Sequence, residues 1–428
     1  MEILLASIFF IGYMLITLET RIDINKAAIA LVTGVACWTV YMLLEKEAGV
    51  INAELSHHLA SIAEILLFLL GAMTIVELID AHDGFQLITD RITTTNKTKL
   101  LYIICFTAFF LSAVLDNLTT TIVMISLCRK LMTDQKDRMV MAGMIIIAAN
   151  AGGAWSPIGD VTTTMLWVKG QISATQVILQ LFIPSLVCLL LPLMVMAVRY
   201  KGNVTRPENV GSNSNLVTTK NEKQLVFYGG IFLLLMVPVF KAVTHLPPYM
   251  GMLGALGVLW LLTELLHKQK KNEDKHFLTV TYAIRKIDTP SILFFFGILA
   301  MVACLESTGM LQHLSSWLDR QMGDPGLIAV STGLLSAIVD NVPLVAAIQG
   351  MYDLTVFPTD AYLWEFIAYS AGTGGSILII GSAAGVAAMG LEKIDFIWYL
   401  KNIGWLALLG FLAGAGVYIL EHRLFFAG

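Results

Sequence analysis

Long apolar runs, each about as long as a bilayer is thick, restrict the fold of this chain more than any other feature. A helix needs about 20 mainly apolar residues to cross the hydrocarbon core. Hydrophobic residues make up 57% of the chain and charged residues only 14%, against about 25% in an ordinary soluble domain. The sequence therefore predicts an all-α polytopic membrane protein and excludes soluble enzymes. The uninterrupted runs lie near 3–19, 27–44, 63–80, 174–198, 224–243, 247–266, 290–306 and 402–422.

Four further apolar stretches contain polar residues in their middle. The stretches near 138–168 and 362–390 are interrupted by glycine-rich polar segments, and we interpret each as a broken, unwound helix that crosses the membrane. The stretches near 98–131 and 324–350 each contain a central Asp-Asn pair. We interpret these two as re-entrant hairpins, which enter and leave the membrane on the same side.

An internal repeat relates these features. The motif SAVLDN at 112–117 recurs as SAIVDN at 336–341, an offset of 336 − 112 = 224 residues. The glycine pair at 152–153 recurs at 374–375, an offset of 374 − 152 = 222 residues. Two motifs in the same order at nearly the same offset indicate that the chain is built from two homologous halves.

Each half contains five crossings, and this odd number requires that the second half is inverted relative to the first. We therefore predict a first inverted repeat over 1–198, a cytoplasmic linker over 199–223 and a second inverted repeat over 224–428. Inverted repeats are a recurrent plan among secondary transporters, with the substrate site near the midplane where the halves meet.

The distribution of basic residues predicts the orientation in the membrane. With the two Asp-Asn stretches as hairpins, the loops on one side hold 22 of the 27 lysines and arginines, and the loops on the other side hold 5. By the positive-inside rule the first side is cytoplasmic. We expect a multi-pass protein of the bacterial inner membrane, with both termini periplasmic and the lipid bilayer as its surroundings.

Two acidic residues lie inside apolar runs at equivalent points of the two halves. Asp116 is followed by Asn117, and Asp340 by Asn341, where each hairpin would turn. Charge inside a membrane is costly, so an intramembrane acid is by default a functional hypothesis. Carboxylates, amides and hydroxyls are hard oxygen ligands, which small cations prefer. The structural alternative is that each Asp caps the second helix of its hairpin.

The broken helices provide the second set of polar groups. The first interruption runs from Asn150 to Asp160, with threonines at 162–164, and the second runs from Ser370 to Ser382. Unwound carbonyls and the C-terminal ends of half-helices favour cations. A glycine-rich packing seam between helices is the alternative interpretation.

The balance of charge in these motifs indicates the charge of the substrate. The first half provides Asp116 and Asp160, whereas the second provides Asp340 and has Ser382 where Asp160 would stand. No lysine or arginine falls inside the motifs. A site that is rich in carboxylates and lacks a fixed positive charge favours a cationic substrate over citrate, succinate or phosphate.

Residues outside the motifs carry weaker signals. Glu77, Asp80 and Glu306 lie near the ends of apolar runs and are either interfacial or part of a proton path. The formal net charge of −4 gives no indication of a nucleic-acid partner. The cysteines show no CxxC or Cys/His ligand spacing, so we interpret them as packing residues. They are Cys37, Cys105, Cys128, Cys188 and Cys304.

At these motifs the chain resembles the NhaD-type sodium/proton antiporters of the ion transporter superfamily. The resemblance rests on SAVLDNLTTT, NAGGAWSPIGDVTTT, SAIVDNVP and SAGTGGS, and it covers essentially the whole chain. It implies a homodimer with a scaffold part and a mobile transport part, and export of Na+ or Li+ against entering protons, with no cofactor. It also implies ion binding at Asp116, Asn117, Asn150, Asp160, Thr162, Thr163, Ser336, Asp340, Asn341, Ser370 and Thr373.

We therefore predict a secondary Na+/H+ and Li+/H+ antiporter that works by alternating access, in which the cation and protons compete for the same intramembrane carboxylates. Related dicarboxylate carriers have Ser-Asn-Thr at the hairpin tips, where this chain has Asp116-Asn117-Leu118 and Asp340-Asn341-Val342. The alternatives on the same fold are a sodium-coupled symporter for an anion and an efflux carrier for a small oxyacid such as arsenite. A membrane enzyme is disfavoured, because no nucleophile–base pair, HExxH motif or phosphate loop occurs.

Overall fold

The structure is a computed structural model that describes residues 2–17, 19–22, 24–45, 48–89, 91–207, 218–268, 270 and 276–426. These residues are almost entirely helical, and the one β-type contact among them is an isolated bridge between Asn96 and Asn203. Residues 208–217 of the predicted linker lie outside the described part. The α-helices are α1 (Glu2–Thr17), α2 (Glu19–Ile22), α3 (Lys26–Leu44), α4 (Ala48–Ala81), α5 (Gln86–Thr89), α6 (Lys97–Leu115), α7 (Asn117–Leu131), α8 (Gln135–Ala154), α9 (Val161–Val168), α10 (Ala174–Arg199), α11 (Lys220–Thr244), α12 (Pro248–Leu266), α14 (Val280–Lys286), α15 (Thr289–Ser307), α16 (Met310–Met322), α17 (Pro325–Ser336), α18 (Asn341–Met351), α19 (Tyr362–Gly374), α20 (Ala383–Glu392), α21 (Phe396–Tyr399) and α22 (Trp405–Glu421).

The prediction of an all-α, multi-pass membrane protein is confirmed. Eight of the described helical segments are long and apolar enough to cross a bilayer. These eight spanning segments differ from the eight predicted apolar runs at two places. The predicted first run, near 3–19, folds as the 16-residue α1, whereas α6, the first arm of a predicted hairpin, has 19 residues and spanning length. All five cysteines are buried and unpaired, as the packing interpretation predicted.

Both Asp-Asn motifs lie at a junction between two helices. Asp116 separates α6 from α7, and residues 337–340 separate α17 from α18. The predicted broken helices also divide in two. The first is interrupted between α8 and α9, and the second between α19 and α20. Four short helices therefore begin near the middle of the molecule: α7, α9, α18 and α20.

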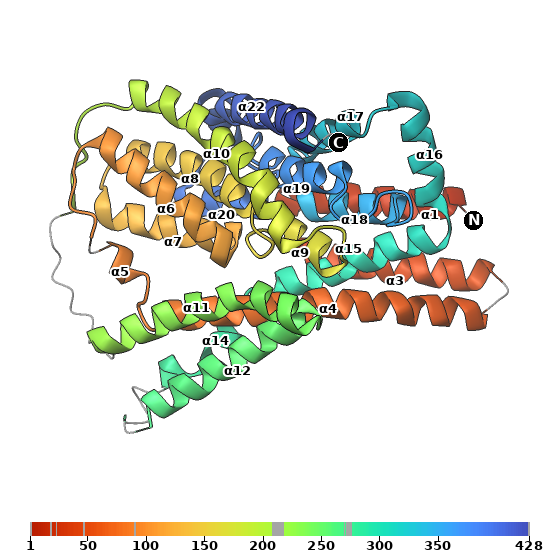
Figure 1. The fold of residues 1–428 in the computed structure, drawn as a ribbon, viewed down its shortest axis with the longest axis horizontal. Helices are drawn as coiled ribbons and strands as arrows, with labels where there is room; N and C mark the ends of the chain where they lie inside the picture. Colours follow the sequence, from red (N-terminus) through yellow and green to blue (C-terminus); the bar gives the residue numbers. More distant parts are fainter. Residues whose placement is uncertain are drawn as a thin grey trace.

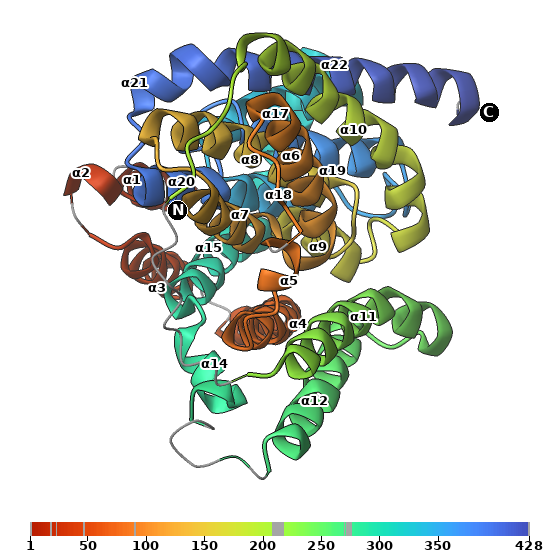
Figure 2. The ribbon, with the colours of Figure 1, turned by 90° about the vertical axis from the view of Figure 1, so that its left-hand side faces the viewer.

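The helices pack as two groups, which Figures 1 and 2 show from two sides. The outer layer consists of α1, α3, α4, α11, α12, α14 and α15, and the central bundle consists of α6–α10, α17–α20 and α22. In Figure 2, α4, α11, α12 and α14 lie below the bundle, and α15 lies between. The outer layer meets the bundle mainly where α15 packs on α18 and α4 packs on α9.

Equivalent residues of the two halves make the same contacts. The Ser112 hydroxyl donates to the Ala149 carbonyl at 2.6 Å, and the Ser336 hydroxyl donates to the Ala371 carbonyl at 2.8 Å. Each bond joins an Asp-Asn helix pair to the broken helix of the same half. The glycines at 152 and 374 also correspond, since each packs directly on a backbone carbonyl of the neighbouring helix, at Phe109 and Gly333 respectively.

A buried ion cluster joins the two halves at one end of the central bundle. The Glu392 carboxylate, at the end of α20, accepts from Arg129 Nε on α7 at 2.7 Å and from Arg138 Nε on α8 at 2.9 Å. Its side chain is only 2% exposed. Because two guanidinium groups compensate one buried carboxylate, α20 is held against the α7–α8 pair of the first half.

We expect Gly152→Ala to destabilise the protein, because the added methyl group would meet the Phe109 carbonyl well inside van der Waals contact. The obstructing atom is backbone, so α6 and α8 have to move apart, at a cost of about 1–3 kcal/mol or more. Gly229→Ala on α11 is the matched control, since nothing lies within 4 Å of the added methyl. Thermal unfolding of both purified variants in detergent tests this; equal melting temperatures would contradict the close packing.

Candidate functional site

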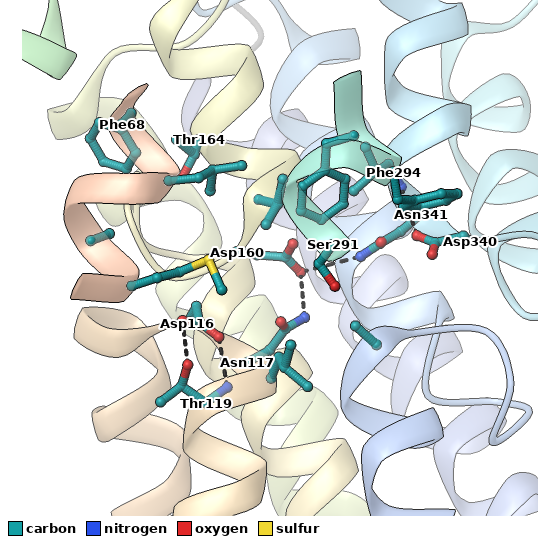
Figure 3. A pocket seen from close by; sticks show the side chains of 18 of the residues that line it. Phe68, Asp116, Asn117, Thr119, Asp160, Thr164, Ser291, Phe294, Asp340 and Asn341 are labelled. Atoms are coloured by element: carbon teal, nitrogen blue, oxygen red, sulfur yellow. Dashed lines mark hydrogen bonds between the residues drawn. The ribbon is translucent and has the colours of Figure 1, made fainter. Parts of the chain in front are cut away.

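Three carboxylates from three different helix junctions line one cavity at the centre of the molecule. Asp116, Asp160 and Asp340 all border it, together with Asn117 and Asn341 (Figure 3). Helices α4 and α15 of the outer layer close the cavity on its other side with mainly apolar side chains. The structure therefore brings together five of the predicted site residues, which are up to 225 positions apart in the sequence (341 − 116 = 225).

Asp160 is the centre of the hydrogen-bond network. Its Oδ2 accepts from Asn117 Nδ2 at 3.1 Å and from Asn341 Nδ2 at 3.4 Å, so the amides of both Asp-Asn motifs meet on one oxygen. Its Oδ1 accepts from the Thr162 backbone N–H at 3.0 Å and thereby caps α9. The residue is 2% exposed. An ionised carboxylate at this depth requires such donors or a cation.

Asp116 caps α7 from a strained backbone conformation. The backbone N–H and the hydroxyl of Thr119 both donate to its carboxylate, at 2.7 and 2.8 Å. Its φ is 113°, a region that residues with a side chain rarely occupy. Strain of this kind persists only where surrounding contacts enforce it, and it concentrates at functional sites. The predicted capping role is therefore present, and the same carboxylate also borders the cavity.

Asn150 connects the two halves through hydrogen bonds next to the residues that line the cavity. Its Oδ1 accepts from Asn117 Nδ2 at 3.0 Å, and its Nδ2 donates to Ser376 Oγ at 2.9 Å and to Ser382 Oγ at 3.0 Å. Ser382 caps α20 in the way that Asp160 caps α9, which agrees with the predicted correspondence of these two positions. Asn150 thus fixes both helix interruptions relative to each other.

The other predicted site residues lie behind the cavity rather than in its wall. The hydroxyls of Ser336 and Thr373 donate to the backbone carbonyls of Ala371 and Tyr369. The hydroxyls of Thr163 and Ser370 are buried and have no hydrogen-bond partner among the described residues. Thr162 contributes its backbone N–H to Asp160. In this conformation these five residues support the site and do not border the cavity.

Lys26 is the one charged residue among the described residues lining the cavity that the sequence analysis did not place there. Its Nζ lies 3.3 Å from Asp340 Oδ2, and its side chain borders the same cavity. The prediction that the site lacks a fixed positive charge is therefore wrong. Lys26 lies 314 residues from Asp340, outside the motifs, and was counted among the loop lysines. A lysine in the first turn of a helix is unfavourable beside the helix dipole, but this signal does not single out Lys26, because α6 and α11 also begin with lysines.

The weaker acidic candidates do not border the cavity. Glu77 lies 3.6 Å from Lys286 Nζ, and Asp80 borders a separate pocket with Asp83 and Lys130. Glu306 is near the far end of α15. Their role in a proton path stays a prediction.

Comparison with known proteins finds similarity to membrane transporters. Residues 13–364 match the CitMHS family model, described as citrate transporter. Sodium/proton antiporter 1 of Arabidopsis thaliana is 48% identical over 99% of this chain and 73% of that protein. Sodium/proton antiporter 2 of the same plant is 45% identical over 98% of this chain and 99% of that protein. The Na+/H+ antiporter NhaD of Vibrio cholerae is 31% identical over 98% of this chain and 91% of that protein.

We expect Asn117→Ala to lower the stability of the folded protein by about 1–3 kcal/mol, because Asn150 Oδ1 and Asp160 Oδ2 each lose a buried donor. Asn402→Ala is the control. Its side chain is exposed and donates to the Trp398 carbonyl, so we expect a change within roughly 0.5 kcal/mol. Melting temperatures in detergent measure both; an unchanged value for Asn117→Ala would show that the network contributes nothing.

Proposed function

We propose that this chain, which belongs to the NhaD-type sodium/proton antiporters within the CitMHS transporter family, exchanges sodium for protons across its membrane. Its relatives from Arabidopsis thaliana and Vibrio cholerae are named as sodium/proton antiporters. They are named as transporters, so the chain is not an enzyme. The observation that carries the proposal is the convergence of Asp116, Asp160 and Asp340 on one cavity.

The chemistry of the cavity suits a small hard cation. Carboxylate oxygens of the three aspartates, with amide oxygens of Asn117 and Asn341, would replace the water shell of Na+ or Li+. A bound proton neutralises the same carboxylates, so cation and proton compete for one set of groups. Protonation on one side releases the cation, and alternating access carries the neutralised site across the membrane. The ions would bind at the residues of the predicted set that border the cavity, with the others supporting them.

The anion alternatives are less favoured. Citrate or another multivalent anion would enter a cavity bordered by three carboxylates and be repelled by them. Lys26 is the one cationic side chain among the described residues that border the cavity, so three carboxylates face a single ammonium group there. A sodium-coupled anion symporter or an oxyacid efflux carrier would need more positive than negative groups around its substrate.

The two halves, 1–198 and 224–428, are proposed to be inverted repeats, each with a re-entrant hairpin. Support comes from the equivalent serine contacts, at Ala149 and Ala371, and from the division of both predicted broken helices. The cavity reaches Ser291 in the first turn of α15, just after the basic α14. We therefore propose that the site opens to the cytoplasm in this conformation and that both termini face the opposite side.

Three further expectations stay part of this proposal. The transported ions include Li+ as well as Na+, because both are small hard cations. The protein is a homodimer, as the family resemblance implies. The bacterial plasma membrane stays the proposed location, although relatives at higher identity than those from Vibrio come from a plant.

Proton flux in everted membrane vesicles tests the function. In a host that lacks its main antiporters, we expect NaCl and LiCl to collapse an imposed pH gradient, measured from about pH 6 to 9.5. Asp116→Asn should abolish this response, because a neutral amide cannot exchange a proton for a cation. Asp353→Asn, at an exposed loop position, should keep it.

Two results would contradict the proposal. Parental sodium-driven flux in Asp116→Asn, at equal protein levels, would remove Asp116 from the site. A parent protein that responds to no cation would exclude the antiporter and leave an anion carrier on the same fold.

A further inference from the structure

We propose that Lys26 is a displaceable latch: its ammonium group holds Asp340 when no transported cation is bound there, and so holds the central bundle against the outer layer. This inference rests on the proposed sodium/proton exchange and adds a positioning residue to it. It assigns to Lys26 the task of preventing the empty site from crossing the membrane.

The geometry places Lys26 between the two groups of helices. It is the first residue of α3, in the outer layer, and its Nζ lies 4.4 Å from the ring centroid of Phe294 on α15, in the same layer. On its other side, Nζ lies 3.3 Å from Asp340 Oδ2 at the start of α18, in the bundle. The two side chains are 23% and 17% exposed, so water screens their attraction only in part.

Lys26 pairs with Asp340, and not with the other two aspartates, because one carboxylate oxygen of Asp340 accepts no other hydrogen bond among the described residues. Both carboxylate oxygens of Asp116 accept from Thr119, and those of Asp160 accept from three donors around it. Asp340 Oδ1 accepts from the Val342 N–H and caps α18, at 3.3 Å. Its Oδ2 faces the ammonium. Asp340 is thus the carboxylate in the cavity that is neutralised by a charge of the protein itself.

The position of Lys26 is unfavourable without that partner. A positive charge in the first turn of a helix is repelled by the helix dipole. The backbone N–H of Lys26 is satisfied by Glu19 Oε1 at 2.9 Å, and the adjacent Asn25 side chain caps α3 through the Ala27 N–H. The start of α3 is therefore stable by itself, and the ammonium group contributes nothing to its capping. The contact that accounts for a lysine here is the one with Asp340.

The latch also lies on the seam that must open during transport. The packing of α15 on α18 is the main contact between the outer layer and the bundle, and Asp340 directly precedes α18. When sodium or a proton neutralises Asp340, the carboxylate no longer attracts the Lys26 ammonium group. The ammonium group then keeps its cation–π contact with the Phe294 ring. One positive charge replaces another, so the half-buried Asp340 carboxylate always has a compensating charge. The loaded bundle can move, and the empty bundle stays attached.

Sodium loss from proteoliposomes at equal pH on both sides tests the latch, with the membrane potential held at zero and a pH-sensitive dye inside. We expect the parent to lose sodium only in step with proton uptake. Lys26→Met should lose sodium roughly tenfold faster than proton uptake accounts for, as expected when one charge-assisted contact disappears. Lys26→Arg keeps the charge and should stay coupled. Lys201→Met, an exposed position outside the cavity, removes the same charge and should also stay coupled.

The outcomes separate this inference from the proposed function. A parent without sodium/proton exchange overturns the function, whereas an exchanging parent with a fully coupled Lys26→Met overturns the latch alone. If Lys26→Met does not fold, the parent protein provides a second measurement. Acetylation of Lys26 by a water-soluble amine reagent, followed by mass spectrometry, should rise several-fold in sodium chloride relative to choline chloride, with Lys201 as reference. Equal labelling in both salts would overturn the latch.

Discussion

The structure depends on side chains that cap the N-termini of helices, because several helices begin inside the protein. A helix that starts at membrane depth exposes backbone N–H groups where no water can satisfy them. Asp116, Asp160, Asp340 and Ser382 accept these N–H groups at the starts of α7, α9, α18 and α20. Because the four starts lie near one another, the same requirement that makes the interrupted helices possible also gathers three carboxylates around one cavity. The candidate ion site is thus a consequence of the way the helices are capped.

Close backbone packing keeps these helix starts together. Gly152 and Gly374 allow the broken helices to touch carbonyls of the neighbouring helices, and Ser112 and Ser336 bond across the same seams. The Glu392 cluster ties α20 to α7 and α8 at one end. These contacts hold most of the bundle as one unit, whereas the outer layer meets it over fewer surfaces, chiefly through α15 and α18. A rigid bundle that slides or rocks on a layer is a physically reasonable way to expose one site to two sides.

The sequence predicted what is local and repeated. The Asp-Asn junctions, both interruptions and the correspondence of Asp160 with Ser382 follow from apolar run lengths, glycines and the internal offset. The bonds of Asn117 and Asn341 to Asp160, and of Asn150 to Ser376, depend on how distant helices pack, and no periodicity encodes that. Lys26 was missed for the same reason: only the packing of α3 on α15, and of α15 on α18, makes a lysine at a helix start a neighbour of Asp340.

A family model described as citrate transporter and relatives named as sodium/proton antiporters both match this chain. The fold provides interrupted helices whose N-termini attract negative charge. Either the protein or the substrate can supply that charge. Where the caps are uncharged, an anionic substrate can supply it. Here three of the four caps are carboxylates of the protein, so the attraction is already satisfied and the remaining demand is for cations. In the proposed exchange, Lys26 meets part of that demand at Asp340 until sodium or a proton replaces it there. In the proposed function, the chemistry of these caps therefore sets the charge of the substrate.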